Sequence, residues 1–327
     1  MGWDSKTVLI TGAGGFIGSH LTEQLVELGA HTRAFVHYNS LGRWGWLDHS
    51  LLKAEIEIFA GDISDRDSVR RAVQDVDVVF HLAALIGIPY SYHAPVSYVR
   101  VNVEGTLNVL QATLEANVER VVHTSTSEVY GTAQYVPIDE QHPLQGQSPY
   151  SATKIGADKL AEAFHCSFGL PVVTVRPFNT YGPRQSARAV IPTVITQCMV
   201  GDTVRLGNLY PTRDLSYVAD AVEAFICAAQ SQRAEGEVIN IGSGQEISIG
   251  DLAHKIADLM GKDVEIECEN ERMRPEGSEV ERLCAANSLA RELLGWEPRY
   301  TLDEGLRLTI KWIGEHLEYY RPDTYAV

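Results

Sequence analysis

The sequence predicts an α/β protein, a doubly wound parallel sheet followed by a smaller, mostly helical lobe. In the first half of the chain, short apolar and β-branched runs alternate with amphipathic stretches of helical length. Strands separated by helices in this way form right-handed βαβ units, and the helices cover both faces of a parallel sheet. After about residue 177 this alternation loosens, and proline and glycine interrupt the chain more often.

The individual elements follow from apolar runs bounded by turn residues. The first part carries predicted strands at 7–10, 32–37, 56–60, 78–82, 120–124 and 172–176. Helices are predicted between them at 15–28, 96–116 and 149–168. The second part carries one short strand, at 237–241, and helices at 189–200, 217–230, 249–260, 288–294 and 302–316. Because helices outnumber strands there, we expect the second lobe to be mostly helical.

Composition excludes several classes of protein. The formal net charge of −16 argues against a wide nucleic-acid or anionic membrane surface. The five cysteines are scattered and form no CxxC pair, so neither a metal site nor a disulfide framework is predicted. No apolar run approaches the ~20 residues of a membrane span, and we see no signal peptide before the first predicted strand. We therefore expect a cytoplasmic protein that binds neither nucleic acid nor membrane.

A glycine-rich turn joins the first predicted strand to the first helix. Gly12, Gly15 and Gly18 have the spacing G-x-x-G-x-x-G, and Phe16 and Ile17 open the helix. Glycines allow a tight turn and a close approach of the backbone, and the helix N-terminus is suited to bind a pyrophosphate. The pattern therefore predicts a Rossmann-like site for NAD or NADP. The alternative is a glycine-rich turn that binds no ligand.

The adenosine end of this site lacks the acidic residue that usually binds the ribose 2′-hydroxyl of NAD. No Asp or Glu occurs between Glu27 and Asp48, whereas His37 and Arg43 could hold a 2′-phosphate. This favours NADP, unless both residues are simply exposed loop residues. Further cofactor contacts are expected after the third and fourth strands, from Asp62, Ile63, Leu82, Ala83 and Ala84.

These observations suggest a division of the chain into two parts. We assign residues 1–177 to a dinucleotide-binding domain and residues 178–327 to a substrate-binding lobe, and we expect the chain to cross between them more than once. Open α/β sheets bind ligands in the crevice at the carboxyl ends of their strands. The second lobe is expected to cover that crevice.

A candidate catalytic pair lies at the start of the helix predicted at 149–168. Tyr150 and Lys154 are four residues apart and therefore share one face of that helix. An ammonium group and a cationic nicotinamide nearby would both favour the phenolate, so that Tyr150 could take a proton from a hydroxyl group while hydride leaves carbon. Taken alone the spacing is a weak signal, because Tyr and Lys occur four apart on many helices.

A cluster of polar residues follows the fifth predicted strand, at the same edge of the sheet. It includes Thr126, Ser127 and Glu128. We expect them to face the crevice beside the Tyr150 and Lys154 pair. The alternatives are a structural hydroxyl at Thr126 and a capping or surface carboxylate at Glu128.

Together these motifs resemble the extended short-chain dehydrogenases/reductases of the NAD-dependent epimerase/dehydratase family. The resemblance covers nearly the whole chain, through the glycine turn, residues 102–106, the Tyr150 and Lys154 pair, residues 176–183 and 213–214. It implies a cofactor that is reduced and re-oxidised within one turnover. It also implies that Tyr150 is the base at a sugar C4 hydroxyl, that Lys154 holds the nicotinamide ribose and that Thr126 hydrogen-bonds near that hydroxyl.

Glu128 points to one branch of this family. A C4-epimerase needs no second base, whereas a 4,6-dehydratase needs a carboxylate that removes the C5 proton and then protonates the departing C6 hydroxyl. The triplet Thr126-Ser127-Glu128 resembles that of the GDP-mannose 4,6-dehydratase type, and UDP-glucuronate decarboxylases carry it too. A decarboxylase and a C4-epimerase therefore stay as alternatives. A non-catalytic nicotinamide sensor is a remote one, because such proteins often lose the Tyr/Lys pair.

Two later stretches, 179–192 and 272–280, resemble the nucleotide-sugar 4,6-dehydratases of the legionaminic-acid pathway, which act on nucleotide-linked N-acetylglucosamine. The resemblance implies that Asn179, Arg213 and Arg274 contact the phosphates or the nucleotide. Arginine forks suit a diphosphate, and the alternative for each arginine is a surface ion pair. It further implies a homodimer in which the helices at 96–116 and 149–168 form a four-helix bundle with their symmetry mates.

Overall fold

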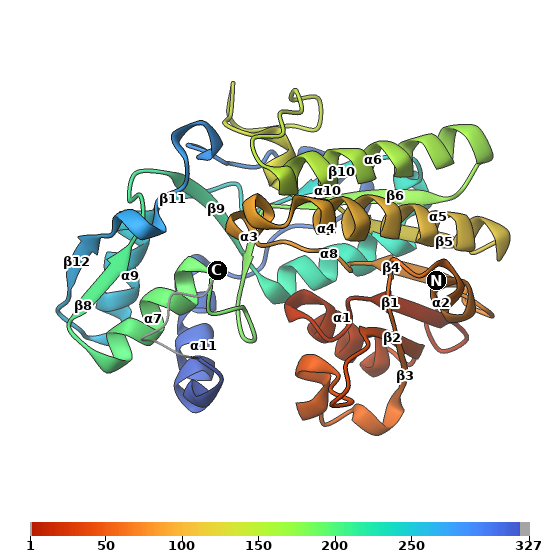
Figure 1. Ribbon diagram of the computed structural model, residues 1–327, viewed down its shortest axis with the longest axis horizontal. Coiled ribbons are helices and arrows are strands. Elements are labelled where there is room, and N and C mark those ends of the chain that lie inside the picture. Colours follow the sequence, from red (N-terminus) through yellow and green to blue (C-terminus); the bar gives the residue numbers. More distant parts are fainter. Residues whose placement is uncertain (1, 321–327) are drawn as a thin grey trace.

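The computed structural model describes residues 2–320 and contains a seven-stranded parallel sheet (Figure 1). The strand order is β10-β6-β5-β4-β1-β2-β3, and every neighbouring pair runs parallel. The order reverses beside β1, whose neighbours are β2 and β4, and such a switch point is where open α/β sheets bind ligands. The strands are β1 Thr7–Thr11, β2 His31–His37, β3 Ile56–Gly61, β4 Val78–His81, β5 Arg120–Thr124, β6 Val172–Pro177 and β10 Val238–Ile241.

Successive side chains along each strand point to opposite faces of the sheet, so each face has its own core. Val8 and Ile10 of β1 pack in the core that includes α1 and α8, whereas Leu9 packs in the core on the other face. Helices α2, α5 and α6 cover that second face. Continuous apolar strands of this kind are typical of a sheet covered on both sides. The helices are α1 Phe16–Glu27, α2 Arg66–Ala72, α5 Gly105–Glu115, α6 Pro149–Phe168 and α8 Val218–Gln230.

The helix predicted at 96–116 is not a uniform α-helix. It consists of α4 (Pro95–Tyr98), a π-helical segment η3 (Val99–Glu104) and α5, and a short helix α3 (Ile88–His93) precedes it. Asn102, in the π-helical segment, is buried and bonds away from the helix: its amide donates to the Leu85 carbonyl at 3.0 Å and to the Thr153 hydroxyl at 3.1 Å. These contacts connect the π-helical segment to α6 and to the segment after β4. The sequence pattern predicted only a regular helix at 96–116.

The second half of the chain contains more β-structure than predicted. Helix α8 and strand β10 follow residue 178 but are part of the larger domain. Strand β10 pairs with β6 in the large sheet, and α8 packs on β5 and β6. Two small sheets, ordered β11-β9-β7 and β12-β8, accompany the remaining helices. Their strands are β7 Asn179–Tyr181, β8 Thr203–Leu206, β9 Thr212–Tyr217, β11 Glu246–Ser248 and β12 Glu265–Cys268.

The remaining helices complete the smaller lobe and the loops around it. Helices α7, α9 and α11 pack against one another beside these sheets, and α10 packs on β10. The longer ones are α7 Val190–Val200, α9 Ile249–Met260, α10 Ser288–Leu294 and α11 Leu302–Glu315. Short 3₁₀ helices are η1 Gly45–His49, η2 Lys53–Glu55, η4 Ser127–Tyr130, η5 Gln232–Ala234, η6 Asn270–Arg272, η7 Glu276–Ser278 and η8 Leu317–Tyr319.

Candidate active site

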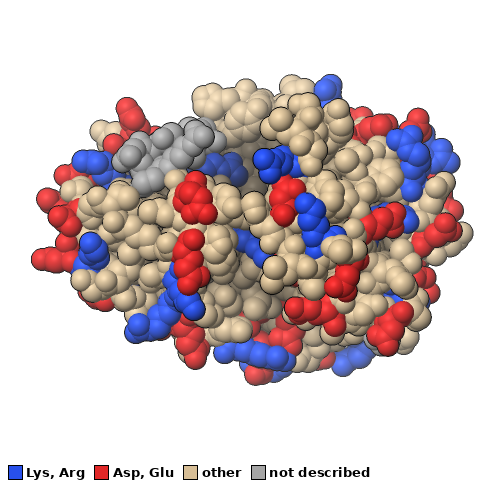
Figure 2. Space-filling view, turned by 90° about the horizontal axis from the view of Figure 1, so that it is seen from below, with Lys and Arg blue, Asp and Glu red and all other residues tan. Residues whose placement is uncertain are grey.

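A cavity of about 960 Å³ lies at the carboxyl ends of the parallel strands, and residues of the smaller lobe line its other side. This volume lies in the range that holds a small-molecule ligand or a cofactor. The face drawn in Figure 2 is hollowed; basic side chains lie in and beside the hollow, and acidic side chains also lie at its edge. The described lining residues include six Lys or Arg (Arg43, Lys154, Arg188, Arg213, Arg272 and Arg274) and two Glu (Glu128 and Glu279). A locally basic cavity can thus accept an anionic ligand on a protein whose net charge is −16.

The glycine turn forms one wall of this cavity. Gly12 has φ of +73°, and a Cβ there would lie 2.9 Å from the backbone nitrogen of Ala83. A Cβ at Gly18 would overlap the carbonyl oxygen of Gly12, so the turn packs directly on the helix. Helix α1 has no side-chain cap and no acidic residue in its first turn, which leaves its first N–H groups available to an anion. The cavity lining includes Gly12, Gly15, Phe16, Ile17 and Gly18.

The loop after β2 closes the adenosine end of this wall. The Asn39 carboxamide oxygen accepts from the Arg43 amide at 3.1 Å, and its nitrogen donates to the Arg43 carbonyl at 2.7 Å. His37 and Arg43 both line the cavity, and the Arg43 guanidinium is largely exposed, 3.9 Å from the Asp48 carboxylate. The predicted cations therefore lie at the rim, where a 2′-phosphate would be expected.

The residues after β3 and β4 differ in their placement. Leu82, Ala83 and Ala84 line the cavity beside the glycine turn, as expected. Asp62 and Ile63 are absent from the lining: the Asp62 carboxylate accepts from the Ser64 amide at 2.8 Å, and Ile63 is buried in the core under α5. The structure thus gives these two residues turn-forming and packing contacts.

Helix α6 brings Tyr150 and Lys154 to the opposite side of the cavity. It begins with a capping box, in which the Ser148 hydroxyl accepts from the Ser151 amide at 3.1 Å, and Pro149 occupies its first turn. Tyr150 and Lys154 line the cavity and are 6% and 4% exposed. The start of the helix is therefore fixed one residue before the phenol, which holds both groups at the crevice.

Burial dominates the titration of both groups. It raises the pKa of Tyr150 above the ordinary range, although the Thr126 hydroxyl hydrogen-bonds the phenol and favours its ionised form. Burial lowers the pKa of Lys154 to about 8, and the Asp158 carboxylate opposes this. Because burial outweighs the favourable contact from Thr126, ionisation of the phenol would need the cationic nicotinamide that we expect beside Tyr150 and Lys154.

Glu128 lies in the same cavity as Tyr150. Thr126 begins the short helix η4, and its hydroxyl accepts from the Glu128 amide at 3.3 Å. The Glu128 side chain is 8% exposed and lines the cavity, and its negative charge contributes to the raised pKa of Tyr150. Ser127 also lines the cavity. The carboxylate is thus enclosed near the phenol instead of capping a helix or lying at the surface.

The predicted substrate residues converge on the far end of the cavity. Arg213, on β9, is buried and lies 3.3 Å from the Glu279 carboxylate, which is 3.7 Å from the Arg274 guanidinium. One carboxylate therefore separates two cations that would otherwise repel. Asn179 lines the same end from β7. These arginines form an ion-pair cluster inside the cavity instead of the surface pairs considered as the alternative.

Several buried polar atoms of the cavity have no hydrogen-bond partner among the described residues. They are Thr124 Oγ1, Asn179 Oδ1, Gln185 Oε1 and Arg274 Nη1. Buried polar groups without partners are costly, and each one calls for a water or a ligand. A polar ligand that spans the cavity would satisfy them, as would the hydroxyl groups and phosphates of a nucleotide sugar.

Several residues that line the cavity were not predicted from the sequence, among them Gln185, Arg188, Asn208 and Glu279. Gln185, Arg188 and Glu279 lie within the stretches 179–192 and 272–280, but nothing in their local pattern singled them out. Arg188 lies so close to Gly87 that a Cβ there would overlap its guanidinium. This contact joins the segment after β4 to the smaller lobe across the cavity.

Within residues 2–320, no group of three or more His, Cys, Asp or Glu side chains is arranged to hold a metal ion. None of the helices in that range combines the length and apolar character needed to cross a bilayer.

Comparison with known proteins identifies the family. The family model described as GDP-mannose 4,6 dehydratase matches residues 9–309. The chain belongs to the GDP-mannose 4,6-dehydratase family. Its sequence is 36% identical over 321 residues to the UDP-N-acetyl-α-D-glucosaminuronate decarboxylase of Bacillus cytotoxicus, covering 95% of this chain and 98% of that protein.

Solved structures of the family extend the range of reactions. DesIV, the dTDP-glucose 4,6-dehydratase from Streptomyces venezuelae, was solved with NAD bound; it has a TM-score of 0.86 and 29% identity and covers 97% of this chain and 99% of its own. The UDP-N-acetylglucosamine 4-epimerase from Methanobrevibacter ruminantium has a TM-score of 0.86 and 30% identity, with coverages of 95% and 99%. The predicted family and Rossmann-like fold are confirmed. Members of the GDP-mannose 4,6-dehydratase family are NAD-dependent nucleotide-sugar enzymes that catalyse dehydration, decarboxylation or epimerisation.

Proposed function

We propose that this protein is a nucleotide-sugar 4,6-dehydratase that acts on a nucleoside-diphosphate N-acetylhexosamine and gives a 4-keto-6-deoxy sugar. The observation that supports it most is Glu128, a carboxylate enclosed in the cavity that also contains Tyr150. An epimerase needs no such group, whereas a dehydratase needs a base at C5. Residues 1–177, with α8 and β10, would bind the dinucleotide, and the remaining elements the sugar nucleotide.

The residues have the following roles in this proposal. When bound, the oxidised nicotinamide accepts a hydride from the sugar C4 and later returns it to C6. Tyr150 takes the proton of the C4 hydroxyl, and Thr126, hydrogen-bonded to the phenol, orients that group. Lys154 holds the nicotinamide ribose, and its positive charge favours the phenolate. The N–H groups at the start of α1 hold the pyrophosphate of the dinucleotide.

The elimination step is assigned to Glu128. Oxidation at C4 acidifies the C5 proton, which the carboxylate removes. The same carboxyl group then gives its proton to the C6 oxygen as the C6–O bond breaks, so that water leaves and Glu128 is ionised again. When the hydride is returned to C6, C5 takes up a proton; release of the proton that Tyr150 took from the C4 hydroxyl balances this step and restores the phenolate. Arg213 and Arg274 bind the substrate diphosphate, and Asn179 donates to it, because guanidinium forks suit phosphate oxygens.

The test is incubation of the purified protein with UDP-, GDP- and dTDP-linked sugars, with products followed by mass spectrometry. Loss of one water from an N-acetylhexosamine nucleotide supports the proposal. An isomer of unchanged mass would assign the protein to the C4-epimerases instead. Release of a bound dinucleotide on denaturation, with no turnover of any sugar, would favour a nicotinamide sensor.

A decarboxylase is the second candidate, because the Bacillus cytotoxicus relative that is 36% identical is named as a nucleotide-hexuronate decarboxylase. Both reactions begin with a ketone at C4, after which either the C5 proton or the C6 carboxylate is lost. A nucleotide hexuronate in the same panel separates them. Loss of carbon dioxide from it, with no loss of water from any hexose, would replace the dehydratase assignment.

The choice of cofactor gives a first prediction. Structures of relatives hold NAD, whereas the absence of an acidic residue at the end of β2 favours NADP here. If Arg43 binds a 2′-phosphate, Arg43→Ala should weaken NADP binding about tenfold through the loss of one charge-assisted contact, and leave NAD binding unchanged. Calorimetric titration with both dinucleotides measures this. Equal weakening of both, or of neither, would remove Arg43 from the 2′-site.

The oligomeric state gives a second prediction, of a homodimer formed through α5 and α6. Apolar side chains are exposed beside these helices: Val96 is 70% and Val99 is 53% exposed. Burying such groups between two copies would remove them from water. We expect a dimer by size-exclusion chromatography with light scattering, and a monomer for Val96→Glu/Val99→Glu. Leu51→Glu, at a fully exposed residue between η1 and η2, is the control and should stay dimeric. A monomeric wild-type protein would contradict the prediction.

A further inference from the structure

Asp158 is a buried carboxylate that the proposed reaction does not use. It lies on α6, one helical turn after Lys154 and two turns after Tyr150, so the three side chains share one face of the helix. It is 4% exposed. Burying a carboxylate is costly unless the group is paired and hydrogen-bonded, so its surroundings should reveal what it does.

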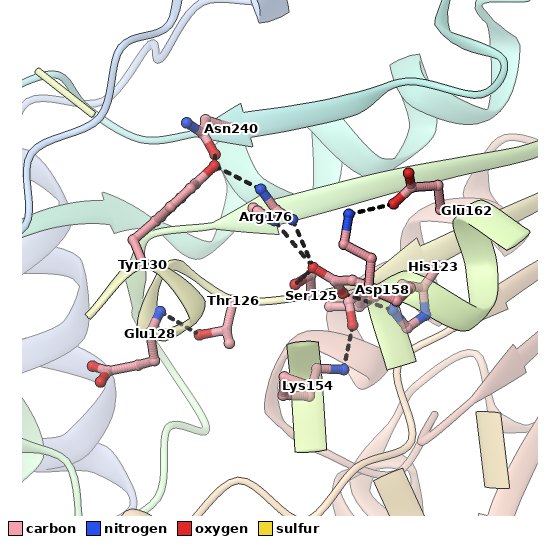
Figure 3. Close-up of polar contacts among 12 residues, drawn as sticks. His123, Ser125, Thr126, Glu128, Tyr130, Lys154, Asp158, Glu162, Arg176 and Asn240 are labelled. Atoms are coloured by element: carbon pink, nitrogen blue, oxygen red, sulfur yellow. Dashed lines mark hydrogen bonds and ion pairs between the residues drawn. The ribbon is translucent and has the colours of Figure 1, made fainter. Parts of the chain in front are cut away.

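Both oxygens of the Asp158 carboxylate have hydrogen-bond partners (Figure 3). One oxygen lies 3.1 Å from His123 Nε2, and the other accepts from Ser125 Oγ at 2.7 Å and from Arg176 Nη2 at 2.9 Å. Arg176 in turn donates to the Tyr130 hydroxyl at 2.9 Å. Burial raises the pKa of Asp158, but the bond from His123 and the Arg176 charge outweigh it and bring that pKa to about 2. Asp158 is therefore ionised throughout the physiological pH range.

The end of β5 connects Asp158 to Lys154. Consecutive residues of this segment bond to α6: His123 and Ser125 contact Asp158, and the Thr124 carbonyl between them accepts from Lys154 Nζ at 2.6 Å. Lys154 and Asp158 thus both attach the same face of α6 to residues 123–125 at the end of β5. A displacement of one would displace the other.

The protonation of Lys154 depends on the negative charge of Asp158. Burial favours the neutral amine, and of the charges in the described part of the chain, Asp158 is the one that opposes this. The nearby imidazoles of His81 and His123 supply no negative charge, and burial lowers the pKa of each. The ionisable groups facing this region are Tyr150 and Asp158 on α6, His81 on β4, His123 on β5, Arg176 on β6 and Glu128 on η4.

We propose that Asp158 is a positioning residue for Lys154, whose buried carboxylate keeps the lysine charged and fixed at the cavity wall. The proposal rests on the proposed function, in which a charged Lys154 supports the ionisation of Tyr150. It assigns Asp158 a role that differs from a purely structural ion pair with Arg176. The Asp158 carboxylate raises the pKa of Lys154, whereas Arg176 is not among the groups that shift it.

The test is to titrate Lys154 directly, by NMR of protein labelled with ¹³C at lysine Cε, with the signal assigned through Lys154→Arg. In Asp158→Asn, loss of the negative charge should lower the titration midpoint of Lys154 by about one pH unit. The alkaline limb of the kcat/KM profile should move to lower pH by the same amount. Glu162→Gln is the matched control: Glu162 lies one turn further on α6 and pairs at the surface with Lys159, so its loss should leave both values unchanged.

Asp158→Asn leaves Arg176 buried without its partner, which can prevent folding. Asp158→Asn/Arg176→Met is therefore made alongside it, because it removes both members of the pair. An unchanged Lys154 midpoint in either variant that folds overturns the proposal. The NMR titration needs no sugar, so a protein inactive on every nucleotide sugar would refute the proposed function without touching this result.

Discussion

Replacing Glu128 with Gln should abolish the release of water from the substrate while leaving oxidation at C4 intact. Gln has nearly the same shape but cannot accept the C5 proton, so the 4-keto-6-deoxy product should form about 10²–10⁴-fold more slowly. Because the hydride has no acceptor carbon until water has left, the cofactor should stay reduced. Rapid mixing with substrate, followed by the absorbance of reduced nicotinamide, measures the two steps separately.

Glu279→Gln is the control for this experiment, since Glu279 is a second carboxylate of the same cavity. It lies between Arg213 and Arg274 instead of beside Tyr150, so its loss should change KM for the sugar nucleotide without trapping reduced cofactor. Near-normal water release by the Glu128→Gln variant would remove Glu128 from the elimination step. The protein would then still be a dehydratase, and another group of the cavity would have to be the base at C5.

The glycine turn and the Tyr150/Lys154 pair were predictable because each is contained in a few consecutive residues. A tight βα turn requires Gly12 and Gly18 through its own backbone geometry, and residues four apart on a helix share a face wherever that helix lies. Glu279 could not be predicted in this way. It reaches the cavity from a loop that follows η7, and only the tertiary fold puts it between two arginines.

The strands of the smaller lobe were missed for a different reason. β7 and β11 have three residues each, too few to show a period of two. β9 carries Arg213 and Asp214 next to each other, and both are buried, which breaks the alternation of apolar and polar residues. Asp214 is satisfied by backbone amides, from Ser243 at 2.6 Å and Ala285 at 3.0 Å. Such long-range contacts decide the fold of this segment, and local sequence carries no signal for them.

Asp62 was predicted to contact adenine, and this contact stays a prediction, since the structure shows only a local contact of its side chain. Its position after β3 predicted a contact with adenine, yet its carboxylate accepts from the Ser64 amide and forms a turn. Asp side chains commonly bond to the backbone two residues on, which is the local alternative to ligand binding. The position of a residue at the end of a strand therefore predicts where it lies, and not which way its side chain turns.

Tyr150→Phe should reduce the oxidation of the sugar itself, the step before Glu128 acts. Without the hydroxyl no group of the cavity wall takes the C4 proton, so both reduced cofactor and product should form about 10²–10⁴-fold more slowly. The pH profile should change as well. With oxidised cofactor bound, wild-type activity should rise with pH as the buried phenol ionises and fall again where Lys154 loses its proton, and Tyr150→Phe should lack the acid limb. Stopped-flow absorbance across pH tests both effects.

Tyr98→Phe is the matched control, because the Tyr98 ring packs edge-on against Tyr150 while its hydroxyl bonds to the Gly87 carbonyl. It keeps the aromatic contact and removes a hydroxyl that takes no proton from the sugar, so its pH profile should retain the acid limb. If Tyr150→Phe oxidised the sugar at nearly the wild-type rate, another group would have to be the base at C4. If instead the two variants lost activity equally with unchanged pH profiles, the effect of Tyr150 would lie in packing the cavity wall and not in proton transfer.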